Sequence, residues 1–213
     1  MSLHEKYRYV VVEGPIGCGK TSLANRLAQR LGATTILEDP KANPFLPLFY
    51  RDMRRYALPT QLFFLFQRVQ HLEGLRQPDL FGKPYVADFA LAKDPLFARL
   101  TLDDAEYQLY LRIYEHVKPQ APPPDLVIYL QASVDTLLWR VKKRGEPMER
   151  EIEEHYLRRL SEAYTTYFHS YADTPLLIVN SERLNFVDDP GHLDLLVERI
   201  QAMRGGREFF NRA

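Results

Sequence analysis

The residues with the clearest chemistry form one short run, Gly-Pro-Ile-Gly-Cys-Gly-Lys-Thr-Ser. It matches the G-x-x-x-x-G-K-[ST] pattern of a phosphate-binding loop, which cradles a nucleotide with backbone N–H groups and a helix N-terminus. Lys20 is expected to reach the β- and γ-phosphates, and the Thr21 hydroxyl to bind Mg²⁺. The sequence therefore predicts a site for ATP and Mg²⁺, formed by nine residues: Gly14, Pro15, Ile16, Gly17, Cys18, Gly19, Lys20, Thr21 and Ser22.

A second chemical signal is the basic segment that begins at Arg140 and continues through Arg144. Phosphoryl transfer depends mainly on charge neutralisation and positioning, so small kinases carry a cationic lid. A solvated basic helix end is the alternative, because the helix dipole also favours cations there. No Asn-Lys-x-Asp motif of a regulatory GTPase is present. We expect a lid at about residues 140–152, with Arg140 and Arg144 as catalytic cations.

Short apolar runs alternate with longer helical patterns, and together they must position these groups. Strands are expected at residues 7–12, 35–37, 85–87, 126–130 and 176–179, and helices at 20–31, 60–75, 103–117, 134–144, 150–171 and 191–203. Buried strands that alternate with helices form a parallel sheet covered on both faces. The prediction is an α/β fold of the P-loop NTPase type, with three α/β/α layers and a five-stranded parallel sheet. Residues 1–203 are expected to form one domain, and residues 204–213 a flexible tail without periodicity.

Composition excludes several other classes of protein. The 213 residues carry 28 Lys and Arg against 28 Asp and Glu, and a dedicated nucleic-acid binder would carry a basic surplus. The single cysteine excludes an intrachain disulfide and a cysteine-based zinc site. No apolar run approaches the ~18 residues of a membrane span, and no signal peptide is evident. We expect a cytoplasmic protein with neither nucleic acid nor membrane as a partner.

Beyond the phosphate loop, a series of polar residues resembles the deoxyribonucleoside kinase family from residue 9 to about residue 189. The matching positions are Glu38, Tyr50, Gln61, Arg68, Asp88, Asp94, Arg140, Arg144 and Glu149. The resemblance implies that Glu38 is the general base on the sugar 5′-hydroxyl, a task that suits a carboxylate. It also implies that Tyr50 and Glu149 contact the 3′-hydroxyl. The alternatives are a solvated turn residue for Glu38 and a solvated lid charge for Glu149.

Two polar residues interrupt the apolar helix expected at residues 60–75. Gln61 and Arg68 are seven residues apart and share a helical face, so they need polar partners such as a base. A core glutamine bonded to the backbone is the alternative for Gln61. The resemblance implies that Asp94 pairs with Arg68 to read the base edge, whereas a helix cap before Pro95 is the competing interpretation. The same apolar helix suggests a homodimer interface, unless core packing alone explains it.

The chain departs from the family pattern at two positions. Asp88, expected to serve Mg²⁺, is followed by Phe89, where the family has arginine. Lys93 is expected to restore that catalytic cation, although lysine is a point donor and cannot bind bidentately. Glu146 replaces a second lid arginine.

The predicted activity is transfer of the ATP γ-phosphate to the 5′-hydroxyl of a deoxynucleoside. The residues do not decide between a purine and a cytosine base, because the Gln61 amide can flip and present complementary donors and acceptors to either. Purines are favoured. The alternatives are a nucleoside-monophosphate kinase and a non-catalytic ATP-binding sensor subunit, the second suggested by the departures at Phe89 and Glu146.

Overall fold

The computed structural model describes residues 6–75, 82–119, 121–186 and 189–211, and its centre is a parallel β-sheet. The strand order is β2-β3-β1-β4-β5-β6, and every pair is parallel. The strands are β1 (Tyr9–Glu13), β2 (Thr34–Ile36), β3 (Tyr85–Ala87), β4 (Leu126–Gln131), β5 (Leu176–Asn180) and β6 (Arg207–Phe210). The predicted α/β fold is confirmed, but the predicted count of five strands is wrong because the sheet has six.

The sixth strand lies in the segment expected to be a flexible tail, so that expectation is wrong for residues 207–210. Strand β6 pairs with β5 from Leu176 opposite Arg207 to Val179 opposite Phe210. As an edge strand it needs only one neighbour and stays partly exposed, so it has no apolar run that the sequence could reveal. Residues 212–213 of the predicted tail lie outside the described residues.

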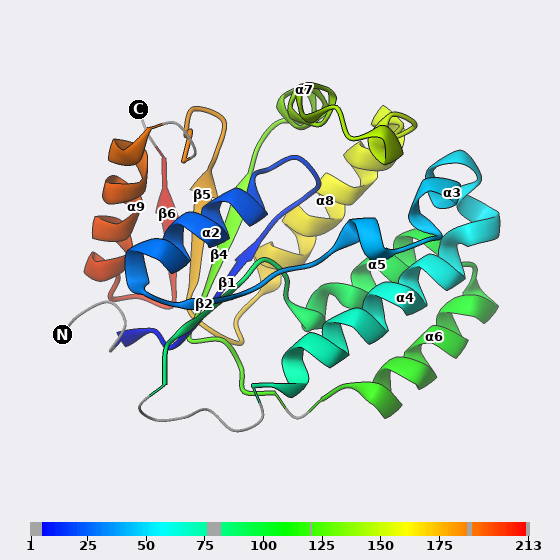
Figure 1. Ribbon diagram of the computed structural model, residues 1–213, viewed down its shortest axis with the longest axis horizontal. Helices are drawn as coiled ribbons and strands as arrows, with labels where there is room; N and C mark the ends of the chain where they lie inside the picture. The colour runs from blue at the N-terminus through cyan, green and yellow to red at the C-terminus, as the bar shows by residue number, and fades with distance from the viewer. Residues whose placement is uncertain (1–5, 76–81, 120, 187–188, 212–213) are drawn as a thin grey trace.

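Helices cover both faces of the sheet (Figure 1). They are α2 (Lys20–Leu31), α3 (Leu46–Arg51), α4 (Met53–Glu73), α5 (Asp94–Thr101), α6 (Asp104–Val117), α7 (Val134–Arg144), α8 (Glu154–Ser170) and α9 (Pro190–Ala202). Helix α2 contacts β1, β2 and β3, whereas α8 lies behind the sheet, where the Phe168 ring stacks 4.3 Å from that of Tyr129. Helices α3 to α6 gather beyond one side of the sheet (Figure 1).

Helix α4 begins seven residues before the sequence-based expectation of residue 60. Asp52 caps its N-terminus by accepting from the backbone N–H of Arg55, and Pro59 is accommodated inside it. A proline lacks the N–H that a helix interior uses, which is why the pattern favoured a start after it. Within the described part of the chain, no helix is long and apolar enough to cross a membrane.

The parallel order brings acidic residues together at one edge. Glu13 is the last residue of β1, Glu38 follows β2 by two residues, and Asp88 directly follows β3. These three strands are neighbours, and ligands of open parallel sheets bind outside the carboxyl ends of the strands. The fold therefore places three carboxylates beside the phosphate loop that follows β1.

Candidate active site

The phosphate loop contains two glycines, Gly14 and Gly17, at which any side chain would be strained and would collide with backbone atoms. Gly14 and Gly17 have φ angles of 149° and 86°, which L side chains rarely adopt. A Cβ at Gly14 would lie 2.5 Å from the carbonyl oxygen of Leu130, and one at Gly17 would lie 2.7 Å from that of Leu137. The loop thus packs directly on β4 and α7. The glycine positions are needed both for the backbone turn and for this close packing.

Lys20 folds back across this loop. Its Nζ donates to the carbonyl oxygens of Gly14 at 2.7 Å and Pro15 at 3.2 Å. Burial opposes its charge, but Cys18, Glu13 and other acidic neighbours raise the pKa of Lys20, so the side chain stays cationic. Burial raises the pKa of the Cys18 thiol, and a protonated thiol in this position is filler and not a nucleophile.

A hydroxyl and a carboxylate meet at the start of α2. The Thr21 hydroxyl donates to Asp88 at 2.5 Å, and the backbone N–H of Glu38 donates to the other Asp88 oxygen at 2.9 Å. Such hard oxygen ligands suit Mg²⁺, which takes one or two protein groups and completes its shell with water and phosphate oxygens. The Thr21 and Asp88 oxygens therefore fit a metal that is shared with a nucleotide.

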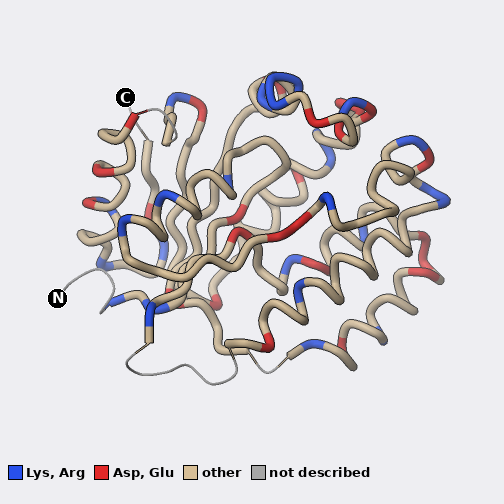
Figure 2. Tube along the Cα trace, viewed as in Figure 1, with Lys and Arg blue, Asp and Glu red and all other residues tan. Residues whose placement is uncertain are grey.

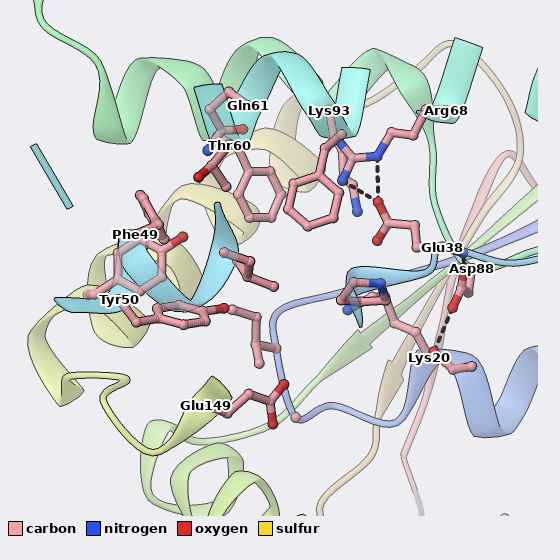
Figure 3. Close-up of a pocket in the computed structure, with 18 of the residues that line it drawn as sticks. Lys20, Glu38, Phe49, Tyr50, Thr60, Gln61, Arg68, Asp88, Lys93 and Glu149 are labelled. Atoms are coloured by element: carbon pink, nitrogen blue, oxygen red, sulfur yellow. Dashed lines mark hydrogen bonds and ion pairs between the residues drawn. The ribbon is translucent and has the colours of Figure 1, made fainter. Parts of the chain in front are cut away.

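Arg68 of α4 connects the carboxylate of Glu38, which is partly buried, with that of Asp94, which is fully buried. Figure 3 shows the pairing of Arg68 with Glu38, and both contacts fall on Oε1 of Glu38. The rings of Phe64 and Phe89 lie 5.2 and 6.0 Å from the guanidinium carbon. Arg68 is thereby held by two carboxylates and two aromatic rings, and its contacts with Glu38 leave Oε2 of that carboxylate unoccupied by the arginine.

The two carboxylates have opposite pKa shifts. Burial works to raise the pKa of Glu38, but Arg68, Lys93 and Lys20 together lower it. For Asp94, burial dominates over Arg68 and Lys93 and raises the pKa to about 6. Glu38 therefore stays ionised at neutral pH and is ready to accept a hydrogen bond from an alcohol.

Asp94 lies behind the cavity and does not line it. The cavity wall includes Arg68 but not Asp94, and the Tyr110 hydroxyl donates to Asp94 from the far side at 3.4 Å. The structure therefore brings Asp94 to Arg68, as expected, but it can influence a base only through that arginine.

Lys93 lies in the same wall with its charge already balanced. Its Nζ is 2.9 Å from Oε1 of Glu13, which also accepts from the Ala90 backbone N–H at 2.6 Å. Phe89 is fully buried beside Arg68. The departure at Phe89 thus adds to the packing around Arg68, and Lys93 lines the cavity as an ion-paired cation.

At the opposite end of the cavity, Tyr50 lies above Glu149 (Figure 3). Glu149 accepts three hydrogen bonds from the Arg144 guanidinium, one on Oε1 at 2.6 Å and two on Oε2 at 2.7 and 3.0 Å. Burial, with the charges of Tyr156 and Glu149, raises the pKa of Tyr50 well above its usual value. The Tyr50 phenol therefore stays protonated, and a hydroxyl and a carboxylate both face this end of the cavity.

A pair of neighbouring polar residues on α4 lies across the cavity from Tyr50 (Figure 3). Gln61 is buried and donates from its amide to the Thr101 hydroxyl at 3.3 Å. Thr60 is 1% exposed, and its hydroxyl has no hydrogen-bond partner among the residues that the structure describes. A buried hydroxyl without a partner is unfavourable, so Thr60 offers an additional polar group to a ligand.

These residues enclose a cavity of about 140 Å³, here called the acceptor pocket. Its lining includes Ile16, Gly17, Lys20, Thr21, Glu38, Tyr50, Gln61, Arg68, Asp88, Lys93, Arg144 and Glu149 from the sequence prediction. It also includes residues that sequence reasoning missed, namely Pro40, Leu46, Phe49, Thr60, Phe64 and Tyr156. Among these, Thr60 alone had a usable signal, because it directly precedes Gln61 on the same helix.

A second, wider space lies on the other side of the phosphate loop, and we call it the donor cleft. Its volume is about 600 Å³. Its lining is Gly17, Cys18, Gly19, Ser22, Trp139, Arg140, Lys143, Arg144, Glu182, Arg183, Leu184, Asn185 and Phe186. Figure 2 shows the basic residues grouped on α7 above the loop. Gly17 and Arg144 line both spaces, so the acceptor pocket and donor cleft meet there.

Arg140 lies in the donor cleft and not in the acceptor pocket. Its guanidinium donates to the carbonyl oxygens of Ser181 at 2.6 Å and Cys18 at 3.3 Å. These acceptors are neutral, and burial lowers the pKa of Arg140 without removing its charge. An anion in the cleft would be a better partner than a carbonyl.

The second departure, Glu146, forms an ion pair at the lid. Its carboxylate lies 2.9 Å from Nζ of Lys41, in the turn after β2. Exposed ion pairs contribute little to stability. The pair nevertheless joins the lid to the segment that carries Glu38. An arginine at residue 146 would repel Lys41 and would not form this contact.

Comparison with known proteins gives consistent results. A model of the deoxynucleoside kinase family matches residues 10–203. The chain is 38% identical to a deoxyguanosine kinase of Bacillus subtilis over 157 residues, 73% of this chain and 76% of the relative. It is 33% identical to a deoxyadenosine kinase of Lactobacillus acidophilus over 193 residues, 84% of this chain and 87% of the relative.

Solved structures share the architecture. A deoxyadenosine kinase from M. mycoides, solved with the products dCMP and dCDP, superposes with a TM-score of 0.79 at 25% identity. The match covers 92% of this chain and all of that chain. The sheet, phosphate loop and lid described above therefore belong to a known architecture.

Proposed function

This chain belongs to the deoxynucleoside kinase family and is an ATP-dependent phosphotransferase acting on a hydroxyl acceptor, and we propose that its preferred acceptors are purine deoxynucleosides. Transfer to a hydroxyl is supported by the Glu38 carboxylate, which is held by buried Arg68 and lies in one pocket with Lys20 and Asp88. The purine preference is supported by the names of the relatives, a deoxyguanosine kinase and a deoxyadenosine kinase. Deoxycytidine is the second candidate, because the Gln61 amide can present either face to a base.

In the proposed mechanism, Glu38 orients the 5′-hydroxyl and accepts its proton as the γ-phosphoryl group moves. Lys20, Arg140 and Arg144 offset the charge that develops on the phosphoryl oxygens. Thr21 and Asp88 would hold Mg²⁺, which neutralises phosphate charge when it is bound. Their mutual hydrogen bond of 2.5 Å places the two oxygens next to each other, which supports a shared metal site.

Sugar recognition is assigned to the Tyr50 end of the pocket. The protonated phenol of Tyr50 and the carboxylate of Glu149 offer a donor and an acceptor to a 3′-hydroxyl. Glu149 is fixed by Arg144, so closing of the lid and sensing of the sugar would be linked. This arrangement would place the sugar between Tyr50 and Glu38.

Base recognition is assigned to Gln61, Arg68 and Thr60, with Asp94 as a positioning residue behind Arg68. The names of the relatives support a purine, since deoxyguanosine and deoxyadenosine kinases are both among them. A hydroxyl donates and accepts, so Thr60 can serve guanine or adenine.

The ion pairs weaken the case for a monophosphate acceptor. Arg68, Lys93 and Arg144 line the acceptor pocket, and each is paired with a carboxylate. A phosphate-bearing acceptor would have to displace such a partner. The non-catalytic alternative loses the argument taken from Phe89 and Glu146, because both departures have structural explanations.

A homodimer is the proposed assembly. Among the exposed large apolar side chains are Phe66 of α4, 52% exposed, and Leu109 of α6, 49% exposed, and these two helices pack against each other (Figure 1). Light scattering tests this proposal: Phe66→Glu should halve the mass of a dimer, while Phe209→Glu on β6 should not. The cytoplasm, which supplies ATP, is the proposed compartment.

The activity is tested by ADP release from Mg·ATP with each of four deoxynucleosides and with dAMP and dCMP. We expect release with deoxyguanosine or deoxyadenosine and none above background with either monophosphate. Release with a monophosphate alone would overturn the sugar and base assignments. Preference for thymidine would overturn the base assignment and leave the sugar assignment intact.

A further inference from the structure

Trp139 is the chain's single tryptophan, and its side chain is 58% exposed on α7. Tryptophan is highly buried on average, so the exposure of Trp139 is unusual and needs an explanation. The helix is anchored by Leu137 and Val141, which are buried. The fold therefore does not use Trp139 for packing of its core, and the ring forms part of the wall of the donor cleft.

The position of the ring relative to the phosphate loop is the second observation. Gly17, Cys18 and Gly19 lie in the same cleft, and a triphosphate bound by their backbone would extend its nucleoside into the remaining volume. The cleft is bounded on one side by α7 and on the other by residues 182–186. Phe186 is the other aromatic residue in this lining, and it is only 7% exposed, so Trp139 offers the larger stacking surface.

Charge around the ring is also suited to a nucleotide. Nζ of Lys143 lies 4.8 Å from the Trp139 ring centroid, a cation–π arrangement. Lys143, Arg140 and Arg183 all line the cleft, against one acidic residue, Glu182. A ligand with a flat ring and several negative charges would therefore match both the tryptophan and the cations.

We propose that Trp139 is the stacking platform for the base of the triphosphate donor. The proposal rests on the proposed function, since it takes the donor to be a nucleoside triphosphate. Stacking uses the π-face that every base possesses and reads no hydrogen-bond pattern. The donor site is thus expected to accept several nucleoside triphosphates, with purines favoured over pyrimidines because they overlap the indole more extensively.

Intrinsic fluorescence tests this directly, because the chain's one tryptophan supplies the signal. Full-length protein is titrated with Mg·ATP in the absence of deoxynucleoside, and in parallel with Mg·tripolyphosphate, which carries the phosphates without a base. We expect ATP to quench the emission and tripolyphosphate to leave it nearly unchanged. Equal responses to both ligands would overturn the proposal.

Variants provide an independent measurement by calorimetry. Trp139→Ala should weaken ATP binding roughly tenfold, consistent with the loss of one stacked base, and should leave tripolyphosphate binding unchanged. Trp139→Phe should bind ATP with an affinity between that of Trp139→Ala and that of the unmodified protein. Leu195→Ala, at an exposed apolar residue of α9, is the matched control and should bind both ligands normally. If Trp139→Ala weakened the binding of ATP and of tripolyphosphate equally, the residue would support the structure of the lid and would not stack on the base.

The same measurements separate the two proposals. Quenching by ATP in a protein that phosphorylates no deoxynucleoside would contradict the proposed function and support the platform. Normal phosphorylation of a deoxynucleoside without quenching by ATP would support the proposed function and contradict the role of Trp139 as a stacking platform.

Discussion

The acceptor pocket and the donor cleft meet at Gly17 and Arg144 but are built on different principles. The acceptor pocket is small, about 140 Å³, and three of its cations, Arg68, Lys93 and Arg144, are each paired with a carboxylate. Its fourth cation, Lys20, belongs to the phosphate loop and donates to carbonyl oxygens. The donor cleft is about 600 Å³, and Arg140 donates there to neutral carbonyl oxygens. Paired charges fix the geometry of a neutral substrate, whereas cations with neutral partners keep their charge available for phosphate.

The largest expected effect concerns the acceptor side. Glu38→Gln removes the proposed base and should lower kcat by 10²- to 10⁴-fold, the usual contribution of general base catalysis. Binding of ATP, measured by calorimetry, should stay within about twofold because the donor cleft does not contain Glu38. Asp39→Asn, an exposed neighbour, is the control; if it lowers kcat as strongly, local structure and not proton transfer explains the loss.

On the donor side, Arg140→Ala should lower kcat/KM for ATP by about 10²-fold, because a cation facing the transferring phosphates is lost. The KM for the deoxynucleoside should change much less, since Arg140 does not line the acceptor pocket. Steady-state kinetics with each substrate varied in turn measures both. Lys142→Ala, an exposed cation on the same helix, should behave like the unmodified protein. A larger effect on the deoxynucleoside would mean that the two regions are not separate.

Acidification should affect the acceptor side selectively. Burial raises the pKa of Asp94 to about 6, so the carboxylate takes up a proton as the pH falls through 6 and its pairing with Arg68 weakens. The KM for the deoxynucleoside should rise roughly tenfold between pH 7.5 and pH 5, while the KM for ATP changes little.

The upward direction of the Asp94 pKa shift distinguishes the expected rise in KM from acid unfolding. A carboxyl whose pKa is higher in the folded state than in the unfolded chain binds its proton more tightly when folded, so Asp94 does not destabilise the fold on acidification. Asp94→Asn should show the raised KM at pH 7.5 already and a flat profile below it. A variant that retains the pH-dependent rise would contradict the assignment.

The smallest effect tests the unpartnered hydroxyl in the acceptor pocket. Thr60→Val keeps the shape and removes the hydrogen bond, so kcat/KM for the preferred purine deoxynucleoside should fall about two- to tenfold. Thr60→Ser keeps the hydroxyl and should retain most of the activity. An equal loss in both variants would indicate packing rather than recognition, and an unchanged rate in Thr60→Val would remove Thr60 from the base site.

Prediction from the sequence worked where the determining residues are close together in the chain. The phosphate loop lies within nine consecutive residues, and its glycine spacing has a local physical cause. Glu38 and Asp88 were expected from the resemblance to the family, and the parallel sheet brings them together because it places the carboxyl ends of its strands at one edge. Strand β6 did not follow, since a short edge strand carries no local signal.

The sequence by itself thus determined a nucleotide-binding α/β fold and the residue types of the site. Only the tertiary structure decided the other partners: Arg68 with Glu38, Lys93 with Glu13, and Glu146 with Lys41. It also left the Thr60 hydroxyl unpartnered and the Trp139 ring exposed in the cleft. The physical reason is that backbone turns depend on neighbouring residues, whereas charge pairing and burial depend on groups brought together from distant parts of the chain.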